Sequence, residues 1–203
     1  IIKLNDVKMK DYSDFIDSQF NELNKIILEG KSNYIKKCQI FAKKIYQCLS
    51  NDHKLIWCGN GGSATDCMHL SGEFVGRYKF DRKSLASICL SSDISVLTCV
   101  ANDYSYEDVF ARQISSLGKE GDLLICLSTS GNSLNIIKAI NEAEKKGIEV
   151  ISFLGKEGGR ASKLVKEKII VESDTTARIQ EIHLMMGHII VELVENMFGY
   201  GRK

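Results

Sequence analysis

Two side chains suited to acid–base chemistry follow a glycine-rich turn in the first half of the chain. His69 and Glu73 are four residues apart, so they share one face if this stretch is helical. An imidazole beside a carboxylate can transfer protons or bind a metal ion. The same spacing also arises by chance on exposed helices, where it gives a surface ion pair. Either interpretation requires a helix at this position.

The residues before this pair predict a strand, a tight turn and a helix. Residues 54–58 form an apolar run typical of a buried strand, and Gly59-Asn-Gly-Gly62 follows it. Ser63 is the expected N-cap of the helix, where free N–H groups and the positive helix end favour an anion such as phosphate. The pattern Gly59-x-Gly61-x-x-Ala64 also satisfies a dinucleotide-binding fingerprint, but that fingerprint normally opens its fold, whereas residues 1–53 precede this strand.

A second strand-turn-helix unit repeats this arrangement further along the chain. Residues 121–127 predict a buried strand that runs into the segment 128–133, and a helix over 134–146 follows, ended by Gly147. The segment offers four hydroxyl donors for phosphate oxygens: Ser128, Thr129, Ser130 and Ser133. The alternative is an ordinary loop in which Ser133 caps the helix. The density of donors favours phosphate binding.

The elements that position these residues indicate an α/β fold. Further strands are expected at 84–90, 149–154 and 168–171, with helical segments at 93–100, 106–117, 162–165 and 176–198. Such alternation predicts a parallel sheet covered on both faces, with ligands beyond the carboxyl ends of its strands. Two amphipathic stretches at 9–28 and 33–49, separated by Gly30, predict a leading helical hairpin that packs against the core or another subunit.

The last helix carries polar side chains on an otherwise apolar surface. They are Gln180, Glu181, His183 and His188. Each needs a partner in the core or in a neighbouring subunit. By spacing alone, Glu181 shares a face with His188 and Gln180 is displaced by about 80°.

Composition narrows the class of protein. The chain has 203 residues, of which 44% are hydrophobic and 26% charged, as expected of one soluble globular domain. A net charge of +1 gives no reason to expect a nucleic acid or a membrane as partner. No apolar run is long enough for a membrane span, and no signal peptide is visible. Seven cysteines without a C-x-x-C pair indicate reduced thiols in a cytoplasmic protein, although Cys58 and Cys67 flank the glycine turn.

Several motifs occur together and in order along the chain. They are Cys58-Gly-Asn-Gly-Gly-Ser63, Met68-His69, Glu73, Asn102-Asp103, Ser128-Thr-Ser-Gly-Asn-Ser133 and Ala177-Arg-Ile-Gln-Glu-Ile-His183. In this combination the chain resembles the bacterial phosphoheptose isomerases of the sugar isomerase (SIS) domain superfamily. The resemblance covers nearly the whole chain, and its combination of motifs is specific, although each motif alone is weak.

The resemblance implies one SIS domain over residues 1–203, with a helical hairpin over 1–50 and a three-layer αβα core over 51–203. The core contains a five-stranded parallel sheet, and the protein is a homotetramer with active sites between subunits. The implied acid–base pair is Glu73 and His188, and the implied zinc ligands, for one zinc ion per subunit, are His69, Glu73, Gln180 and His188. The implied substrate contacts are Asn60, Gly61, Gly62, Ser63, Glu73, Asn102, Asp103, Ser128, Thr129, Ser130, Ser133 and Gln180.

The implied activity is isomerisation of sedoheptulose 7-phosphate to D-glycero-D-manno-heptose 7-phosphate through an enediol. This reaction is the first step toward nucleotide-activated heptose for lipopolysaccharide or capsule. Two alternatives remain at this point: a non-catalytic scaffold of the same fold that binds the replication initiator, and an isomerase of another sugar phosphate. The retention of His69, Glu73, Gln180 and His188 favours an enzyme.

Overall fold

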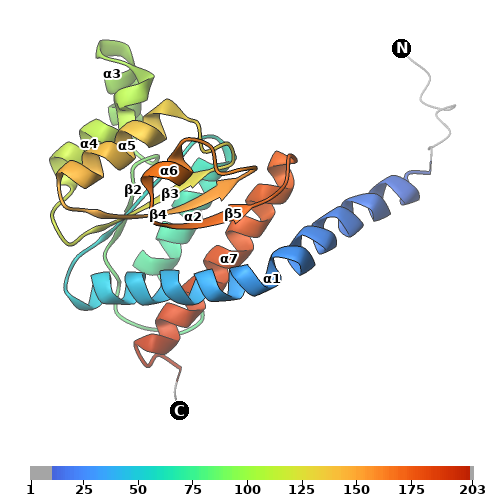
Figure 1. Ribbon diagram of the computed structural model, residues 1–203. Helices are drawn as coiled ribbons and strands as arrows, with labels where there is room; N and C mark the ends of the chain where they lie inside the picture. The colour runs from blue at the N-terminus through green and yellow to red at the C-terminus, as the bar shows by residue number, and fades with distance from the viewer. Residues whose placement is uncertain (1–10, 202–203) are drawn as a thin grey trace, which may run out of the picture.

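A parallel sheet of five strands forms the centre of the molecule. The computed structural model describes residues 11–201, and its strand order is β2-β1-β3-β4-β5 (Figure 1). The strands are β1 (Leu55–Gly59), β2 (Ser87–Cys89), β3 (Leu123–Ser128), β4 (Glu149–Gly155) and β5 (Glu167–Val171). The predicted αβα fold with five parallel strands is confirmed, although the second strand is shorter than its apolar run suggested.

Helices cover both faces of this sheet. One face carries α1 (Ser13–Ser50), α2 (Gly62–Val75) and α7 (Thr176–Met197). The other carries α3 (Ile94–Asp103), the 3-10 turn η2 (Tyr106–Asp108), α4 (Val109–Leu117), α5 (Leu134–Lys145) and α6 (Ala161–Leu164). Successive residues of a strand point to opposite faces of the sheet, so they pack in two different hydrophobic cores. Trp57 packs in the core with α1, α2 and α7, and Ile56 in the core on the opposite face.

The order in which the chain adds strands to the sheet reverses between β1 and β3. From β1 the chain crosses to β2 on one side, and from β3 it continues to β4 and β5 on the other. Gly59 pairs with Leu127, so the two neighbouring strands finish at the same edge. A ligand of an open parallel sheet binds at such a reversal point, beyond the carboxyl ends of the strands.

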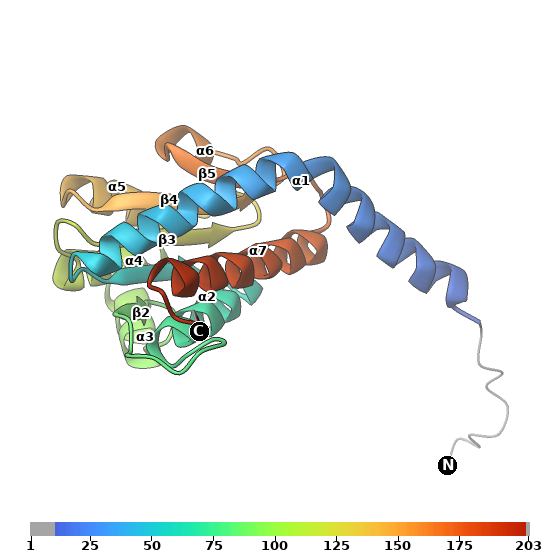
Figure 2. The same ribbon diagram turned by 90° about the horizontal axis from the view of Figure 1, so that it is seen from below.

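The predicted hairpin within residues 1–50 is wrong. One continuous helix, α1, runs from Ser13 to Ser50, and the expected start at Met9 lies outside the described residues. Gly30 lies inside this helix, and the buried ring of Tyr34 packs against it: a Cβ atom at position 30 would be 2.1 Å from Tyr34 Cζ. A helical glycine costs only about 1 kcal/mol relative to alanine. Figure 2 shows that the amino-terminal end of α1 projects beyond the body of the molecule.

Between residues 11 and 201, none of the helices combines the length and apolar character needed to cross a lipid bilayer. The seven cysteines all carry free thiols, and six of them are buried.

Candidate active site

The loop between β3 and α5, here called the cradle (Ser128–Ser133), is folded back on itself. The Gly131 N–H donates to Ser128 Oγ (3.1 Å), and the Asn132 N–H donates to Ser130 Oγ (3.2 Å). Both oxygens thereby accept a hydrogen bond, which leaves their O–H groups to donate to a ligand. The cradle can therefore present hydroxyl donors to an anion.

Helix α5 begins directly after the cradle. Ser133 occupies the N-cap position, as the ordinary-loop alternative expected, but its side chain makes no capping hydrogen bond. The Ile136 N–H is taken up by Asn135 Oδ1 (2.9 Å), so the N–H groups of Leu134 and Asn135, with the positive end of the helix dipole, are what the helix start offers at this edge. These features suit a phosphate group.

The loop between β1 and α2 meets the first turn of α5, directly after the cradle, through two amides. Asn60 Nδ2 donates to Asn135 Oδ1 (2.9 Å), and Asn135 Nδ2 donates to Asn60 Oδ1 (2.8 Å). Tyr106 Oη also donates to Asn60 Oδ1 (2.9 Å). Sequence reasoning missed Asn135, although a polar residue in the first turn of an apolar helix is a usable signal. The two donor-rich loops form one continuous edge.

Helix α2 starts two residues earlier than expected. Gly61 is its N-cap, with φ of 55°, and Gly62 is its first residue, so the prediction that Ser63 is the N-cap is wrong. Ser63 instead lies buried in the first turn. The N-cap of α2 makes no side-chain hydrogen bond, so this helix also presents free N–H groups at the edge.

Three ionisable side chains meet where α2 packs against α7, a contact here called the seam. His69 Nε2 lies 2.9 Å from His188 Nε2 and Glu73 Oε1 lies 3.5 Å from His69 Nε2. One ligand atom from each residue lies within 4.8 Å of the others. Burial lowers the pKa of His188, the neighbouring His69 lowers it further, and Glu73 opposes the shift. The structure therefore brings together three of the four predicted metal ligands, including both members of the predicted acid–base pair.

Gln180 lies at the start of this seam. Its amide occupies the space beside Gly62, where a Cβ atom would be 2.5 Å from Gln180 Nε2. Only glycine at position 62 permits this approach. Glu181 is exposed and forms an ion pair with Arg178. Gln180 therefore faces α2, in agreement with the resemblance, whereas spacing alone had favoured Glu181.

Asn102 and Asp103 lie at the exposed end of α3. Asn102 Nδ2 donates to Asp103 Oδ1 (2.8 Å), and Cys99 Sγ is 3.5 Å from Asp103 Oδ2. The chain returns to the loop edge three residues after Asp103, where Tyr106 reaches Asn60. Their predicted contact with substrate stays a prediction.

The loop between α2 and β2, residues 76–86, contains groups that sequence reasoning missed. The Tyr78 ring stacks on the His188 imidazole, with centroids 5.6 Å apart and planes 11° apart. Arg82 Nε donates to Glu195 Oε1 (2.8 Å), and both side chains are at most 1% exposed. Burial raises the pKa of Glu195, but Arg82 and the N–H groups of residues 78 and 79 bring it below its usual value. No local sequence pattern signals these contacts, which join residues at least 110 positions apart.

His183 lies beneath the site rather than in it. Its Nε2–H donates to the Leu154 carbonyl oxygen (3.0 Å), and its side chain is fully buried. Burial lowers the pKa of His183 to about 4, so the imidazole is neutral. The partner expected for this polar residue on α7 is therefore the backbone of β4.

The seam has the donor set of a metal site. Two imidazole nitrogens and a carboxylate oxygen from α2 and α7 are ligands that zinc accepts, and zinc at catalytic centres keeps a further position for water or substrate. The lowered pKa of His188, caused first by burial, favours the neutral form that binds metals. His69, Glu73 and His188 therefore fit a divalent metal ion.

Comparison with known proteins agrees with this geometry. Residues 18–155 match the model of the SIS domain family. The phosphoheptose isomerase of Sulfurimonas denitrificans is 45% identical over 181 residues, which cover 89% of this chain and 92% of that protein. That of Clostridium acetobutylicum is 44% identical over 185 residues, covering 91% of this chain and 93% of that protein.

Solved structures give the same result. The phosphoheptose isomerase from Neisseria gonorrhoeae superposes with a TM-score of 0.85 at 34% identity, covering 91% of this chain and 99% of that one. The enzyme from Francisella tularensis has a TM-score of 0.88 at 30% identity, covering 92% of this chain and 100% of that one. The chain belongs to the phosphoheptose isomerase family of SIS-domain proteins.

Proposed function

We propose that this protein isomerises sedoheptulose 7-phosphate to D-glycero-D-manno-heptose 7-phosphate. The observation that carries the proposal is the cluster in the seam, where a carboxylate and two imidazoles lie within 4.8 Å of one another. An aldose–ketose isomerase needs a base for a carbon-bound proton and an acid for the adjacent oxygen. The cradle supplies the second requirement of the substrate, a site for its phosphate.

The substrate lies along the start of the seam in this proposal. Its phosphate binds at the cradle, to the hydroxyls of Ser128, Thr129, Ser130 and Ser133. The carbon chain passes the glycine turn and Gln180 toward Glu73. Two contacts support this path: Gln180 lies against Gly62, and a Cβ atom on Gly155 would meet both Thr129 and Ile179, so the start of α7 lies beside the cradle.

The chemistry moves one hydrogen between adjacent carbons. Glu73 removes a proton from C1 while the C2 carbonyl oxygen gains a proton, which gives an enediol. The C1 hydroxyl then loses its proton as C2 gains one, and the aldose forms without any oxidant or reductant. His188 is the proposed acid for the oxygens, supported by its Nε2 lying 2.9 Å from His69 Nε2 in the cluster that contains the Glu73 carboxylate. Proton transfer and metal binding are alternative roles of this nitrogen.

We assign zinc to this cluster, with His69, Glu73, Gln180 and His188 as ligands. A bound zinc ion polarises sugar oxygens and stabilises negative charge on them. The residues themselves orient that ion and the reacting carbons. Product of this reaction would enter nucleotide-activated heptose synthesis for lipopolysaccharide or capsule, in the cytoplasm, where the free thiols of all seven cysteines are stable.

We also propose that residues 1–203 form one SIS domain and that four copies assemble, with active sites between subunits. Large apolar side chains are exposed along α1, at Phe15, Phe20, Leu28 and Ile35. A groove of about 460 Å³ between α1 and α7 is lined by apolar residues, among them Met185 and Ile189. Contiguous apolar surface of this kind marks protein interfaces.

Replacement of the base tests the activity. Glu73→Gln should lower kcat by about 10²- to 10⁴-fold, because the amide cannot accept the C1 proton. Glu181→Gln, an exposed acid on α7, is the matched control and should turn over normally. The assay is NMR of sedoheptulose 7-phosphate in D₂O, which reports the aldose and deuterium at C2.

Two results would overturn parts of the proposal. If Glu73→Gln isomerised at the wild-type rate, Glu73 would not be the base. If metal-loaded wild-type protein bound sugar phosphates without turnover, the scaffold alternative would replace the enzyme, and turnover of other ketose phosphates alone would change the substrate.

A further inference from the structure

Tyr78 lies on the face of a proposed catalytic side chain without belonging to the cluster itself. Its ring is nearly parallel to the His188 imidazole, 5.6 Å between centroids and 11° between planes. His188 is simultaneously directed at His69, whose Nε2 is 2.9 Å from its own Nε2. A flat ring against one face of the imidazole restricts rotation of the His188 ring about its Cβ–Cγ bond. The direction of Nε2 is thereby restricted.

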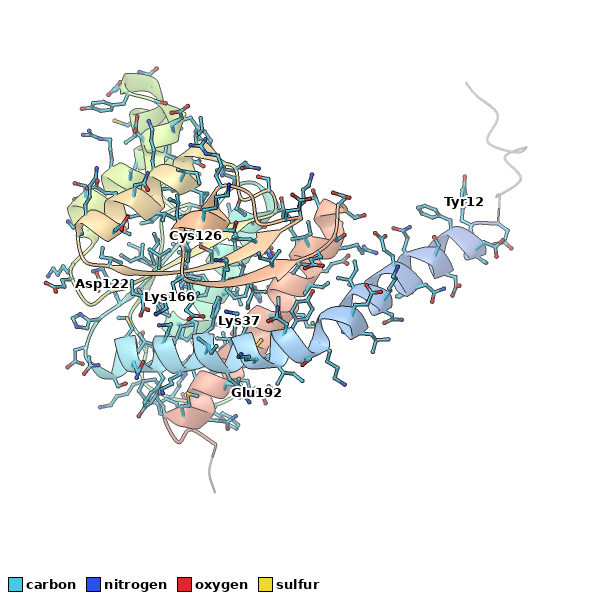
Figure 3. The ribbon with its side chains drawn as sticks, in the orientation of Figure 1. Tyr12, Lys37, Asp122, Cys126, Lys166 and Glu192 are labelled. Atoms are coloured by element: carbon cyan, nitrogen blue, oxygen red, sulfur yellow. The ribbon has the colours of Figure 1, made fainter. Side chains whose placement is uncertain are left out.

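The loop that carries Tyr78 is fastened to one face of α7. Lys79 Nζ forms an ion pair with Glu192 (2.8 Å), and the N–H groups of Tyr78 and Lys79 both donate to the Glu195 carboxylate (3.1 Å each). His188, Glu192 and Glu195 follow the i, i+4, i+7 spacing, so they share one face of the helix. Glu192 is labelled on α7 in Figure 3. These contacts hold the backbone of Tyr78 against the same face of α7 that carries His188.

The same loop is fastened to α2. The guanidinium of Arg82 donates to the carbonyl oxygens of Glu73 (2.6 Å) and Phe74 (2.9 Å), the last turn of α2, while its Nε donates to Glu195. One buried ion pair thus ties together the helix that supplies Glu73 and the helix that supplies His188. The loop spans both sides of the seam.

We propose that Tyr78 is a positioning residue that fixes the ring plane of His188 for metal binding and proton transfer. The inference rests on the proposed function for its activity readout, but its metal-binding readout does not depend on the substrate. The ring, not the hydroxyl, carries the effect, because the observed contact is face to face. The cradle lies at the start of the seam, so phosphate recognition should not depend on Tyr78.

The test compares Tyr78→Leu with Tyr78→Phe, using Co²⁺ as the probe. Leucine keeps apolar volume but has no flat face, so Co²⁺ should bind about 3- to 10-fold more weakly, with an altered visible spectrum, as expected for loss of an aromatic pair. The kcat for sedoheptulose 7-phosphate should fall by a similar factor while KM stays unchanged. Phenylalanine should restore the affinity, the spectrum and kcat.

Tyr200→Leu is the matched control, because Tyr200 stacks on Phe198 rather than on a residue of the cluster. Wild-type behaviour of Tyr78→Leu toward Co²⁺ would overturn the proposal, and so would equal impairment of Tyr78→Phe and Tyr78→Leu. A rise in KM alone would also overturn it, since it would make Tyr78 a substrate contact. If the wild type binds Co²⁺ but does not isomerise the sugar, the proposed function fails and the Co²⁺ comparison still decides the role of Tyr78.

Discussion

The cradle is held by short-range hydrogen bonds: Ser128 Oγ accepts one from the N–H three residues later, and Ser130 Oγ accepts one from the N–H two residues later. The seam instead joins His69 to His188, which are 119 positions apart in the sequence. The cradle is shaped by its own sequence and by the helix that follows it. The seam depends on two helices and on the loop of residues 76–86 that fastens them. Because the anion site is formed by residues close together in the sequence, it can be predicted from the sequence. Because the acid–base site is formed by residues far apart in the sequence, substitutions remote from it should affect it.

The largest effect should come from breaking the fastening of the seam. Arg82→Met leaves the Glu195 carboxylate buried without its guanidinium partner, and loss of one member of a buried pair costs about 3–5 kcal/mol of unfolding free energy. Urea denaturation measures this loss. Lys79→Met, which removes the exposed ion pair with Glu192, should be close to neutral.

The same variant separates the two regions. In Arg82→Met protein that remains folded, Co²⁺ affinity should fall while inhibition by inorganic phosphate stays unchanged. If both fell together, the cradle and the seam would not be independent, and the comparison drawn here would be wrong.

A smaller loss of unfolding free energy should follow from lowering the pH, because His183 on α7 becomes protonated on unfolding. The unfolded side chain binds a proton below about pH 6.5, but in the folded protein burial lowers its pKa to about 4. The stabilisation by the neutral form is therefore complete above pH 6.5 and is lost as the pH falls toward 4, by about 3 kcal/mol in total.

Urea denaturation of metal-free protein at several pH values measures this slope. His183→Gln keeps a donor for the Leu154 carbonyl oxygen but cannot gain a charge, so its stability should vary less over this range. An unchanged slope in His183→Gln would assign the acid sensitivity to other groups.

The smallest effect should come from the cradle side, where Asn135 holds Asn60. Asn135→Ala removes two reciprocal hydrogen bonds and should cost about 1–3 kcal/mol, because Asn60 Nδ2 loses its acceptor and Asn60 Oδ1 keeps only the Tyr106 hydroxyl. KM for the sugar phosphate should rise, and Co²⁺ affinity should not change. Asn141→Ala, at an exposed position on the same helix, is the control; a loss of metal affinity in Asn135→Ala alone would contradict the separation of the two regions.

The sequence predicted what local patterns encode. Apolar runs followed by small polar residues located β1 and β3 and the two loops at their carboxyl ends, and the i, i+4 spacing brought His69 and Glu73 together. Ser133 as an N-cap position was also predictable. The metal set required the family resemblance, because nothing local connects His188 to α2.

Other features were beyond local patterns because tertiary packing decides them. Gly30 predicted a break, but the ring of Tyr34 covers it and the helix continues. Tyr78 and Arg82 gain their roles only when the chain returns as α7. Gln180 rather than Glu181 faces α2 because the absence of a side chain at Gly62 leaves room for its amide.

The length of α1 has a further consequence for how the protein responds to dilution. Its 38 residues span about 57 Å, and Phe15, Ile16 and Phe20 near the outer end are more than half exposed in one chain. A helical end without apolar cover is marginal in water. If neighbouring copies supply that cover, mass action links the helicity of α1 to protein concentration, so the thermal midpoint and the helical circular dichroism signal should both rise as the solution is concentrated.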